Sequence, residues 1–465
     1  MTLSVGQIAD VVDGTCHHVE ACGSVSNVVV DSRGARAGAL FVAIDGERVD
    51  GHAFAAEAIA AGAEVALTSR VLDVPCIVVD DPVLALGRLA HWVRREIMSC
   101  EVVAITGSSG KTSTKDLVAQ VLRHAGPTVA AEGSFNTEVG VPLTMLRVDA
   151  STRFLILEMG MRGLGHIRTL CEFAEPAIGV IVNVGSAHLG LLGSREAVAR
   201  AKAEILDGLP AEGFAIVPGD DSLVMEQATA TNARVVTFGQ GPACDVRATD
   251  VRLDEQARPS FTLIHEDQAA PVAMRLHGVH WVSNGLAAAA VALCLGMPIE
   301  AVAHALSEAT PESRWRMEVS DAPGGFTVIN DSYNANPESV RAALEALAVM
   351  SDGRRSWAVL GEMRELGDAS AEAHADLGRI VAHLGLSRLV CVGHAAEPIL
   401  RAAIDAGFDA AAAVTVPDPD AATALLMHEV RPGDVVLVKA SRSIGLERVA
   451  AALLTQRDQI TEDAL

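Results

Sequence analysis

Short apolar runs alternate with longer Ala-rich amphipathic segments along most of the chain. In the middle of the sequence these runs are VVAI, FLILE, IGVIVNVG, AIV and VVTF, at residues 102–105, 154–158, 178–185, 215–217 and 235–238. Runs of this length suit strands of a parallel sheet, and the segments between them have the apolar spacing of helices. The pattern predicts a mostly parallel central sheet with helices on both faces.

The same alternation occurs in a stretch at each end of the chain. Near the amino terminus the strand candidates are VSNVVVDS and ALFVAID, and from about residue 312 they are FTVIND, SWAVL, RLVCVG and VVLVKA. Because 465 residues exceed one ordinary core, we expect an α/β protein of three domains. They are a small N-terminal α/β domain (1–84), a central P-loop ATPase-like domain (85–311) and a C-terminal Rossmann-like domain (312–465).

Composition and charge narrow the range of functions. With 59 acidic and 36 Lys or Arg residues, the formal charge of −23 argues against binding to long nucleic acid, although backbone amides can still bind a small anion. The N-terminal segment lacks the features of a signal peptide and no apolar stretch reaches about 18 residues, so we expect no transmembrane segment and a cytoplasmic location. The eight cysteines show no CxxC spacing and are expected to be free thiols.

Residues 106–114, TGSSGKTST, join a strand candidate to a helix-like segment. Only two residues separate the glycines, whereas the common P-loop has four. The segment is still similar to a P-loop in what its groups can do. Backbone N–H groups can approach an anion, a lysine can reach the terminal phosphates, and a hydroxyl can bind Mg²⁺. The alternative is an ordinary Gly- and Ser-rich turn. The predicted ATP-binding residues here are Gly107, Ser108, Ser109, Gly110, Lys111, Thr112 and Ser113.

Two other central strand candidates lead into residues that suit a metal ion. Glu158 ends FLILE, where a charged group at the end of a buried strand needs a partner such as a divalent cation. His188 follows VIVNVG and could ligate a metal or bond a phosphate, although taken alone it is more often a plain loop histidine. Lys202 lies in SREAVARAKAEIL, a predicted helix capped by Ser194, and by itself indicates only an exposed helix lysine.

A polar cluster follows the first strand candidate of the third domain. In INDSYNANPESV, Pro337 fits the first turn of a helix that Asn336 would cap. The cluster contains more polar groups than capping needs, which favours a binding role at this strand end. Its members are Asn330, Asp331, Tyr333, Asn334 and Asn336.

Taken together, these motifs resemble the Mur ligase family of ATP-dependent amide-forming enzymes. The resemblance runs almost from end to end, and the short spacing of the two glycines is similar to the family's own form. Thr137, where an Asn often follows Asn136, and Ala440, in place of a common Gly, depart from the family pattern. The matching motifs are DSRGARAGALFVAIDGERVDGH, TGSSGKTST, GSFNTEVGVPLTML, LEMGMRGLGHI, NVGSAHL, AKAEI, NDSYNANPESV, GEMRELG and VKASRS.

The resemblance implies a role for each matching residue. Lys111, Glu158, His188 and Lys202 would be catalytic, with Thr112, Glu158, His188 and Lys202 at two Mg²⁺ ions. Lys202 matches a lysine that relatives carry as a carbamate, which would make it an anionic N-carboxylysine ligand. The further residues implied to contact ATP are Asn284, Arg314 and Asp331. Those implied to bind the other substrates are Ser32, Arg33, Gly46, His52, Asn136, Asn334, Asn336, Lys439, Ser441 and Arg442.

The implied reaction joins D-Ala-D-Ala to UDP-MurNAc-tripeptide through an acyl phosphate, a step of peptidoglycan precursor synthesis, and we expect a monomer. Within the family, SYNANP and GEMRELG favour this dipeptide-adding activity over ligases of diamino acids, whose DNPR-like motif is absent, and over folylpolyglutamate-type ligases. A protein that binds nucleotide without turnover is the alternative outside the enzymes. The third residue of the peptide, lysine or diaminopimelate, is left open.

Overall fold

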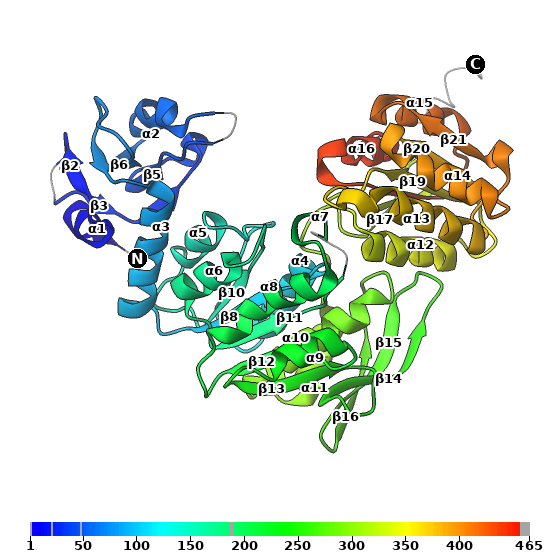
Figure 1. The fold of residues 1–465 in the computed structure, drawn as a ribbon, viewed down its shortest axis with the longest axis horizontal. Helices are drawn as coiled ribbons and strands as arrows, with labels where there is room; N and C mark the ends of the chain where they lie inside the picture. Colours follow the sequence, from blue (N-terminus) through cyan, green and yellow to red (C-terminus); the bar gives the residue numbers. More distant parts are fainter. Residues whose placement is uncertain (1, 20–21, 47–48, 186–188, 456–465) are drawn as a thin grey trace.

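The computed structural model covers the 465 residues and describes all of them except 1, 20–21, 47–48, 186–188 and 456–465. Three larger sheets follow one another along the chain, each with its own helices (Figure 1). The central domain lies between the N-terminal domain, drawn in blue, and the C-terminal domain, drawn in yellow to red. The mixed α/β fold with three domains is therefore confirmed.

The N-terminal domain contains a five-stranded sheet of order β2-β7-β6-β5-β4. Only β2 runs antiparallel to its neighbour. The helix α3 (Pro82–Glu96) begins at Asp81, whose side chain caps it, and packs against helices of both the first and the central domain. The other elements are β1 (Leu3–Ser4), α1 (Val5–Val12), β2 (Thr15–His17), β3 (Ser24–Val25), β4 (Asn27–Val29), η1 (Ser32–Gly34), β5 (Ala39–Val42), η2 (Gly51–Phe54), α2 (Ala55–Ala60), β6 (Ala63–Thr68) and β7 (Cys76–Val78).

The central sheet has nine strands in the order β16-β15-β14-β13-β12-β11-β8-β10-β9. It is parallel from β9 to β14 and antiparallel from β14 to β16. Its strands are β8 (Glu101–Thr106), β9 (Thr128–Ala130), β10 (Phe154–Glu158), β11 (Ile178–Ile181), β12 (Phe214–Pro218), β13 (Arg234–Gly239), β14 (Val246–Leu253), β15 (Pro259–His265) and β16 (Gln268–Ala273). Its helices are α4 (Lys111–Arg123), α5 (Gly140–Met145), α6 (His166–Ala174), α7 (Leu189–Leu192), α8 (Arg195–Asp207), α9 (Ser222–Ala228), α10 (His280–Cys294) and α11 (Ile299–Glu308).

The apolar run of β8 is continuous because both faces of the central sheet are covered. Val102 and Ala104 pack into the hydrophobic cluster on one face, and Val103 and Ile105 pack into the cluster on the other. Since successive strand residues point to opposite faces, a strand covered by helices on both sides needs apolar residues at every position. The sheet thereby fixes the carboxyl ends of β8, β10 and β11 side by side.

The C-terminal domain has a six-stranded sheet of order β17-β18-β22-β19-β20-β21, parallel except for the edge strand β17. This is the expected Rossmann-like arrangement. Its strands are β17 (Glu318–Asp321), β18 (Thr327–Asn330), β19 (Ser356–Gly361), β20 (Arg388–Val392), β21 (Ala413–Val416) and β22 (Val435–Lys439). Its helices are α12 (Pro337–Ser351), η3 (Gly367–Ala369), α13 (Ser370–His383), η4 (His394–Ala396), α14 (Glu397–Asp405), η5 (Ala410–Ala412), α15 (Pro419–Glu429), η6 (Arg442–Ile444) and α16 (Glu447–Thr455).

The predicted strands of the central and C-terminal sheets are present, whereas the antiparallel strands β15 and β16 were not predicted. Their alternating apolar and polar residues have the pattern of a half-covered sheet rather than of a buried run. Within the part of the chain that the structure describes, no helix is long and apolar enough to cross a membrane. The exact domain boundaries at residues 84 and 311 stay a prediction.

Candidate active site

The turn between β8 and α4 can present amide groups to an anion. Gly110 precedes the helix with a φ of 75°, and a Cβ atom added there would lie 2.8 Å from Oδ1 of Asn284. Glycine is therefore needed both for the left-handed backbone and for the close approach of Asn284. No side chain caps α4, so the N–H groups of its first turn, which have no partner inside the helix, are left for a ligand.

Asn183, just beyond β11, fixes the shape of this turn. Its Oδ1 accepts hydrogen bonds from the backbone N–H groups of Ser108 and Ser109, at 3.1 and 3.0 Å, and its Nδ2 donates to the Ser109 carbonyl at 3.1 Å. Two of the amides expected to hold phosphate are thus occupied by a side chain of the protein. The anion-facing amides are expected from Gly110 onward, at the helix N-terminus.

Lys111 begins α4 and points back over the turn. Its Nζ donates a hydrogen bond of 2.7 Å to the Gly107 carbonyl. Burial lowers the pKa of the Lys111 ammonium, whereas the negative charge of Glu158 acts in the opposite direction. The lysine therefore reaches the place where the helix dipole is positive, which suits the terminal phosphates of a nucleotide.

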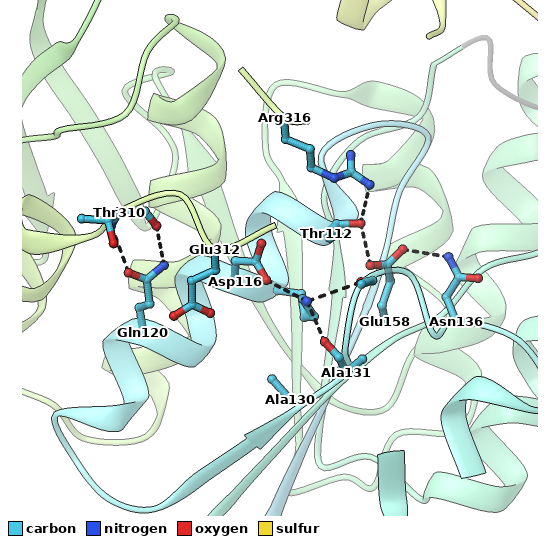
Figure 2. Close-up of polar contacts among 12 residues, drawn as sticks. Thr112, Asp116, Gln120, Ala130, Ala131, Asn136, Glu158, Thr310, Glu312 and Arg316 are labelled. Atoms are coloured by element: carbon cyan, nitrogen blue, oxygen red, sulfur yellow. Dashed lines mark hydrogen bonds and ion pairs between the residues drawn. The ribbon is translucent and has the colours of Figure 1, made fainter. Parts of the chain in front are cut away.

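Glu158 lies at the centre of a buried polar network beside this turn (Figure 2). Thr112 Oγ1 donates to Glu158 Oε2 at 2.7 Å, and Asn136 Nδ2 donates to Oε1 at 2.8 Å. Arg316, which precedes the C-terminal sheet, donates from Nη2 to Thr112 Oγ1 at 2.8 Å. The hydroxyl of α4 and the carboxylate at the end of β10 thus meet next to the turn between β8 and α4.

These two side chains suit Mg²⁺ when a nucleotide supplies further oxygens. No group of three or more His, Cys, Asp or Glu residues able to hold a metal occurs in the described part of the chain. Mg²⁺ in nucleotide sites is commonly bound through one or two protein oxygens together with phosphates and waters. The donor set of Thr112 and Glu158 therefore fits the ion. The predicted ligand His188 lies outside the described residues.

Lys202 is buried, so the expectation of an exposed helix lysine is wrong. It lies on α8, which Ser194 caps as predicted, and its residue exposure is 1%. Burial lowers the pKa of Lys202 well below its ordinary value, and the charge of Lys111 adds to this effect. The Lys202 side chain is buried because α8 packs on β11 and β8. The sequence of one Ala-rich helix could not reveal this packing.

In the C-terminal domain, Asp331 and Lys439 form a buried ion pair at the ends of β18 and β22. Lys439 Nζ donates to Asp331 Oδ2 at 2.6 Å and to the Asn334 carbonyl at 2.9 Å. The other carboxylate oxygen, Oδ1, accepts the Met317 N–H at 3.1 Å. Burial lowers the pKa of Lys439, and the adjacent Asp331 opposes this shift. The pair fixes the loop that contains the predicted cluster of amides.

The central and C-terminal domains contact each other at this point and enclose a cavity of about 470 Å³. Asn336, which caps α12, donates from Nδ2 to the Ser108 carbonyl at 3.4 Å, and Ser134 Oγ is hydrogen-bonded to Tyr333 Oη. The predicted residues that line this cavity are Ser108, Ser109, Gly110, Lys111, Thr112, Ser113, Asn136, Glu158, Asn284, Asp331, Asn334, Asn336 and Lys439.

The predicted sugar-nucleotide residues lie apart from this cavity, in the N-terminal domain. Ser32 and Arg33 belong to η1, where Arg33 pairs with Asp31, and hydrogen bonds from Arg33 lower the pKa of Asp31 to about 2. His52 is buried in η2 and accepts a hydrogen bond from the Ser69 N–H at 3.0 Å through Nε2. Gly46 is exposed in the loop between β5 and η2.

The residues that line the cavity do not include the predicted Gly107, Lys202 and Asn330, nor three further predicted residues. Arg314 is exposed, whereas Arg316, two residues later, reaches Thr112. Ser441 is buried and accepts the Arg364 N–H at 2.9 Å through Oγ. Arg442 lies over the Trp315 ring, with its guanidinium carbon 4.2 Å from the ring centroid. In this arrangement the arginine at the phosphate turn is therefore Arg316.

Sequence reasoning missed several cavity residues besides Arg316. Asn183 followed an apolar strand run and could have been noticed as a strand-end amide. His280 and Trp281 also line the cavity, and within the described residues His280 Nδ1 and Trp281 Nε1 are buried without a hydrogen-bond partner. Burial lowers the pKa of His280 to about 4, so its ring is neutral near pH 7. Nothing in the sequence around these two residues singled them out.

Three family models match consecutive parts of the chain. The Mur ligase family catalytic domain matches residues 24–93, the Mur ligase middle domain matches residues 105–292, and the Mur ligase glutamate ligase domain matches residues 315–442. Their order corresponds to the order of the three sheets.

Known proteins are similar along nearly the whole chain. The UDP-N-acetylmuramoyl-tripeptide–D-alanyl-D-alanine ligase of Mycobacterium tuberculosis is 45% identical, over 97% of this chain and 98% of that protein. A crystal structure of MurF from Acinetobacter baumannii matches with a TM-score of 0.87 and 32% identity, over 98% of this chain and 99% of the other. MurF ligase from Thermotoga maritima in complex with ADP matches with a TM-score of 0.79 and 29% identity, over 92% and 97%. On these similarities, the chain belongs to the Mur ligase family.

Proposed function

We propose that this chain, an ATP-dependent ligase that joins D-Ala-D-Ala to UDP-MurNAc-tripeptide, performs the reaction in the cavity between its central and C-terminal domains. The main observation is that a helix N-terminus, the Thr112–Glu158 pair and the Asp331–Lys439 pair all line one cavity. The first two suit a magnesium nucleotide, and the third brings the other domain to it. The ADP complex of the Thermotoga maritima relative supports nucleotide binding by this fold.

The carboxylate of the tripeptide must be activated before an amine can attack it. The γ-phosphate of ATP is transferred to this carboxylate, which gives an acyl phosphate and ADP. The D-Ala-D-Ala amine then attacks the acyl carbon, so that a C–N bond forms, the C–O bond to phosphate breaks and the amine loses a proton. The protein contributes positions and charges rather than a covalent bond.

The cavity residues suit this transfer in different ways. The Lys111 ammonium and the amides of the first turn of α4 would hold the phosphoryl oxygens as their charge shifts. Thr112 and Glu158 would hold Mg²⁺, which neutralises phosphate charge when bound. The cross-domain contact of Asn336 with Ser108 would keep water from the acyl phosphate while the domains are together.

Lys202 suits a carbamate. A buried lysine with a lowered pKa has a free amine that can add to CO₂, which forms an N–C bond and releases a proton. The resulting carboxylate would be an anion near Lys111 and a ligand for a second Mg²⁺. The carboxylate would attract the Lys111 ammonium, whereas a protonated Lys202 would repel it.

We assign the three substrates to the three domains. Residues 1–84 would hold the UDP-sugar, 85–311 the ATP, and 312–465 the dipeptide. The polar loops η1 and η2 support the first assignment, with Ser32, Arg33, Gly46 and His52 as the contacts. For the dipeptide, Asn334, Asn336 and Lys439 line the cavity, whereas Ser441 and Arg442 would need the loop after β22 to face the substrate.

We further propose that the enzyme acts as a monomer in the cytoplasm. Cys76, Cys171 and Cys391 are buried thiols that form no disulfide, which suits a reducing compartment. Sedimentation of the purified chain at the working concentration would test the oligomeric state, and a dimer would overturn it.

The activity is tested by following phosphate release and the mass of the peptide product. With ATP and Mg²⁺ present, phosphate release should require both UDP-MurNAc-tripeptide and D-Ala-D-Ala, and the product should be UDP-MurNAc-pentapeptide. Tripeptides with lysine and with diaminopimelate at the third position would identify the natural substrate. Phosphate release from ATP alone, without a pentapeptide, would contradict the proposal.

A further inference from the structure

The linker between the central and C-terminal domains follows one face of α4. It comprises residues 309–317, between the end of α11 and the start of β17. Figure 2 shows Gln120 and Thr112 of α4 beside Thr310 and Arg316 of the linker. Because a helix turns by about 100° per residue, Thr112, Gln120 and Arg123 project within one sector of α4. The helix that begins at the phosphate turn therefore also contacts the linker.

Gln120 binds the backbone of Thr310 at both of its polar groups. Its Nε2 donates to the Thr310 carbonyl at 3.0 Å, and its Oε1 accepts the Thr310 N–H at 3.0 Å. A side-chain amide that matches a backbone donor and acceptor at once fixes the linker in position and in direction. A shift of the linker by one residue would break both bonds.

A second contact lies one helical turn further along α4. The guanidinium of Arg123 faces the Glu312 carboxylate, with Nη1 hydrogen-bonded to Oε1 and Nη2 3.4 Å from Oε2. Both side chains are partly exposed, so the pair is worth little as a contribution to stability. Its paired geometry instead adds directional specificity to the position of the linker.

The end of the linker is held in a strained conformation at the cavity. Trp315 and Met317, on either side of Arg316, have φ angles of 61° and 51°. Such left-handed conformations of large side chains persist only where surrounding contacts hold them. The Trp315 carbonyl accepts the Tyr333 N–H at 3.1 Å, and the Arg316 guanidinium lies 4.3 Å from the centroid of the Tyr333 ring.

We propose that Gln120 and Arg123 are positioning residues, which set the register of the linker on α4 and thereby place Arg316 at Thr112. Neither residue lines the cavity, so each acts through Arg316. Arg316 Nε is buried without a hydrogen-bond partner within the described residues and is available to a ligand. The expected effect on kcat rests on the proposed function, because Arg316 would contact the phosphates of ATP only while the linker keeps this register.

The kinetic test compares Gln120→Ala with Gln227→Ala, a matched change on α9 of the same domain. Gln120→Ala should lower kcat about tenfold and change the KM for UDP-MurNAc-tripeptide less than twofold, since a loss of two neutral hydrogen bonds misplaces Arg316 without touching that substrate. Gln227→Ala should behave as wild type. In an Arg316→Ala background, Gln120→Ala should lower kcat less than twofold, because the residue through which Gln120 acts is already absent.

A charge exchange keeps the test independent of folding. Arg123→Glu should lower kcat about threefold, and the double variant Arg123→Glu, Glu312→Arg should recover it, because both side chains are partly exposed and the exchange keeps the pair. The inference is overturned if Gln120→Ala and Gln227→Ala have the same kcat. It is also overturned if Gln120→Ala lowers kcat by the same factor in the Arg316→Ala background as in wild type.

Limited proteolysis examines the linker without any turnover. Trypsin can cut after the exposed Arg314, and Gln120→Ala should raise the rate of this cut about tenfold, whereas Gln227→Ala should leave it unchanged. If wild type releases no phosphate with both substrates present, the proposed function fails. If Gln120→Ala nevertheless speeds the cut after Arg314, the inference on the linker register stands. Equal cleavage of the two glutamine variants would overturn the register.

Discussion

In the N-terminal domain, the polar side chains of η1 and η2 find partners within 20 residues of the sequence, whereas several polar side chains of the cavity find partners much further away. Asp31 binds Arg33 and Asp50 binds His52, each two residues apart. In contrast, Thr112 and Glu158 are 46 residues apart, and Asn336 and Ser108 are 228 apart. The first kind of contact can form within one small domain, whereas the contact between Asn336 and Ser108 exists only when two domains meet.

This difference indicates which property each region controls. The loops η1 and η2 are already held by local pairs, so changes there should alter the affinity for the sugar nucleotide and little else. The cavity depends on the relative position of two domains, so changes there should alter the chemical step. Substitutions in the two regions should therefore have separable effects on kcat and on KM.

Lys111→Ala should abolish turnover while the protein stays folded. Removal of the ammonium at the phosphate turn is expected to lower kcat about 10³-fold, because charge on the transferring phosphoryl group loses a nearby cation. ADP release measures the rate, and circular dichroism serves as the control for folding. Turnover at the wild-type rate would remove the turn from the mechanism.

Lys202→Met should lower kcat about 10- to 100-fold. Methionine has a similar length and needs no polar partner in this buried place, so the fold should persist while the proposed carbamate can no longer form. Labelled bicarbonate should give a carbamate signal in the carbon NMR spectrum of wild type only. A variant as active as wild type would exclude a role for this lysine.

His280 should make the cavity region sensitive to acid. Its pKa is lowered to about 4 in the folded protein, whereas an unfolded histidine has a pKa of about 6.5. The unfolded state therefore binds more protons between these values, so the stability from the neutral ring is complete above pH 6.5 and is lost as the pH falls towards 4. At about 1.36 kcal/mol per unit, the loss is at most about 3 kcal/mol.

The control for this pH dependence is His280→Phe, which keeps an aromatic ring next to Trp281. Urea unfolding between pH 7 and pH 4.5 should show a smaller loss of stability in the variant than in wild type. The Asp31 pair of the N-terminal domain should not respond in this range, because its lowered pKa of about 2 means that its contribution is lost only as the pH falls from 3.8 towards 2. Equal slopes for both proteins would show that the ring does not titrate on unfolding.

Arg33→Ala should have the smallest effect. The side chain is 84% exposed, so the midpoint of thermal unfolding should stay within about one degree of wild type. The KM for UDP-MurNAc-tripeptide should rise a few fold at unchanged kcat, because a cation at the proposed sugar-nucleotide site is lost. A fall in kcat without a change in KM would contradict the separation of the two regions.

The strand ends of the site could be predicted from sequence because their signal is local. Glu158 ends an apolar run of the central sheet and Asp331 follows one of the C-terminal sheet. Within each sheet, the carboxyl ends of the parallel strands lie at one edge. The turn at 107–113 was found in the same way, from a strand, glycines and a helix. Glu158, Asp331 and residues 108–113 line the cavity, whereas Gly107 does not.

The residues that sequence reasoning misplaced depend on distant packing. Lys202 is buried by a sheet that its own helix does not encode, and the choice of Arg316 over Arg314 depends on the path of the linker along α4. His280 and Trp281 are recognised as site residues only because they line the cavity in the folded protein. Contacts between elements far apart in sequence leave no periodic signal within either element.

The most direct test of the account is a crystal structure with Mg²⁺ and a non-hydrolysable ATP analogue. The account predicts the terminal phosphates at Lys111 and the first turn of α4, with the ion about 2.0–2.1 Å from an oxygen of Thr112 or Glu158. A nucleotide bound elsewhere, with Glu158 still hydrogen-bonded to Thr112 and no ion beside them, would contradict it.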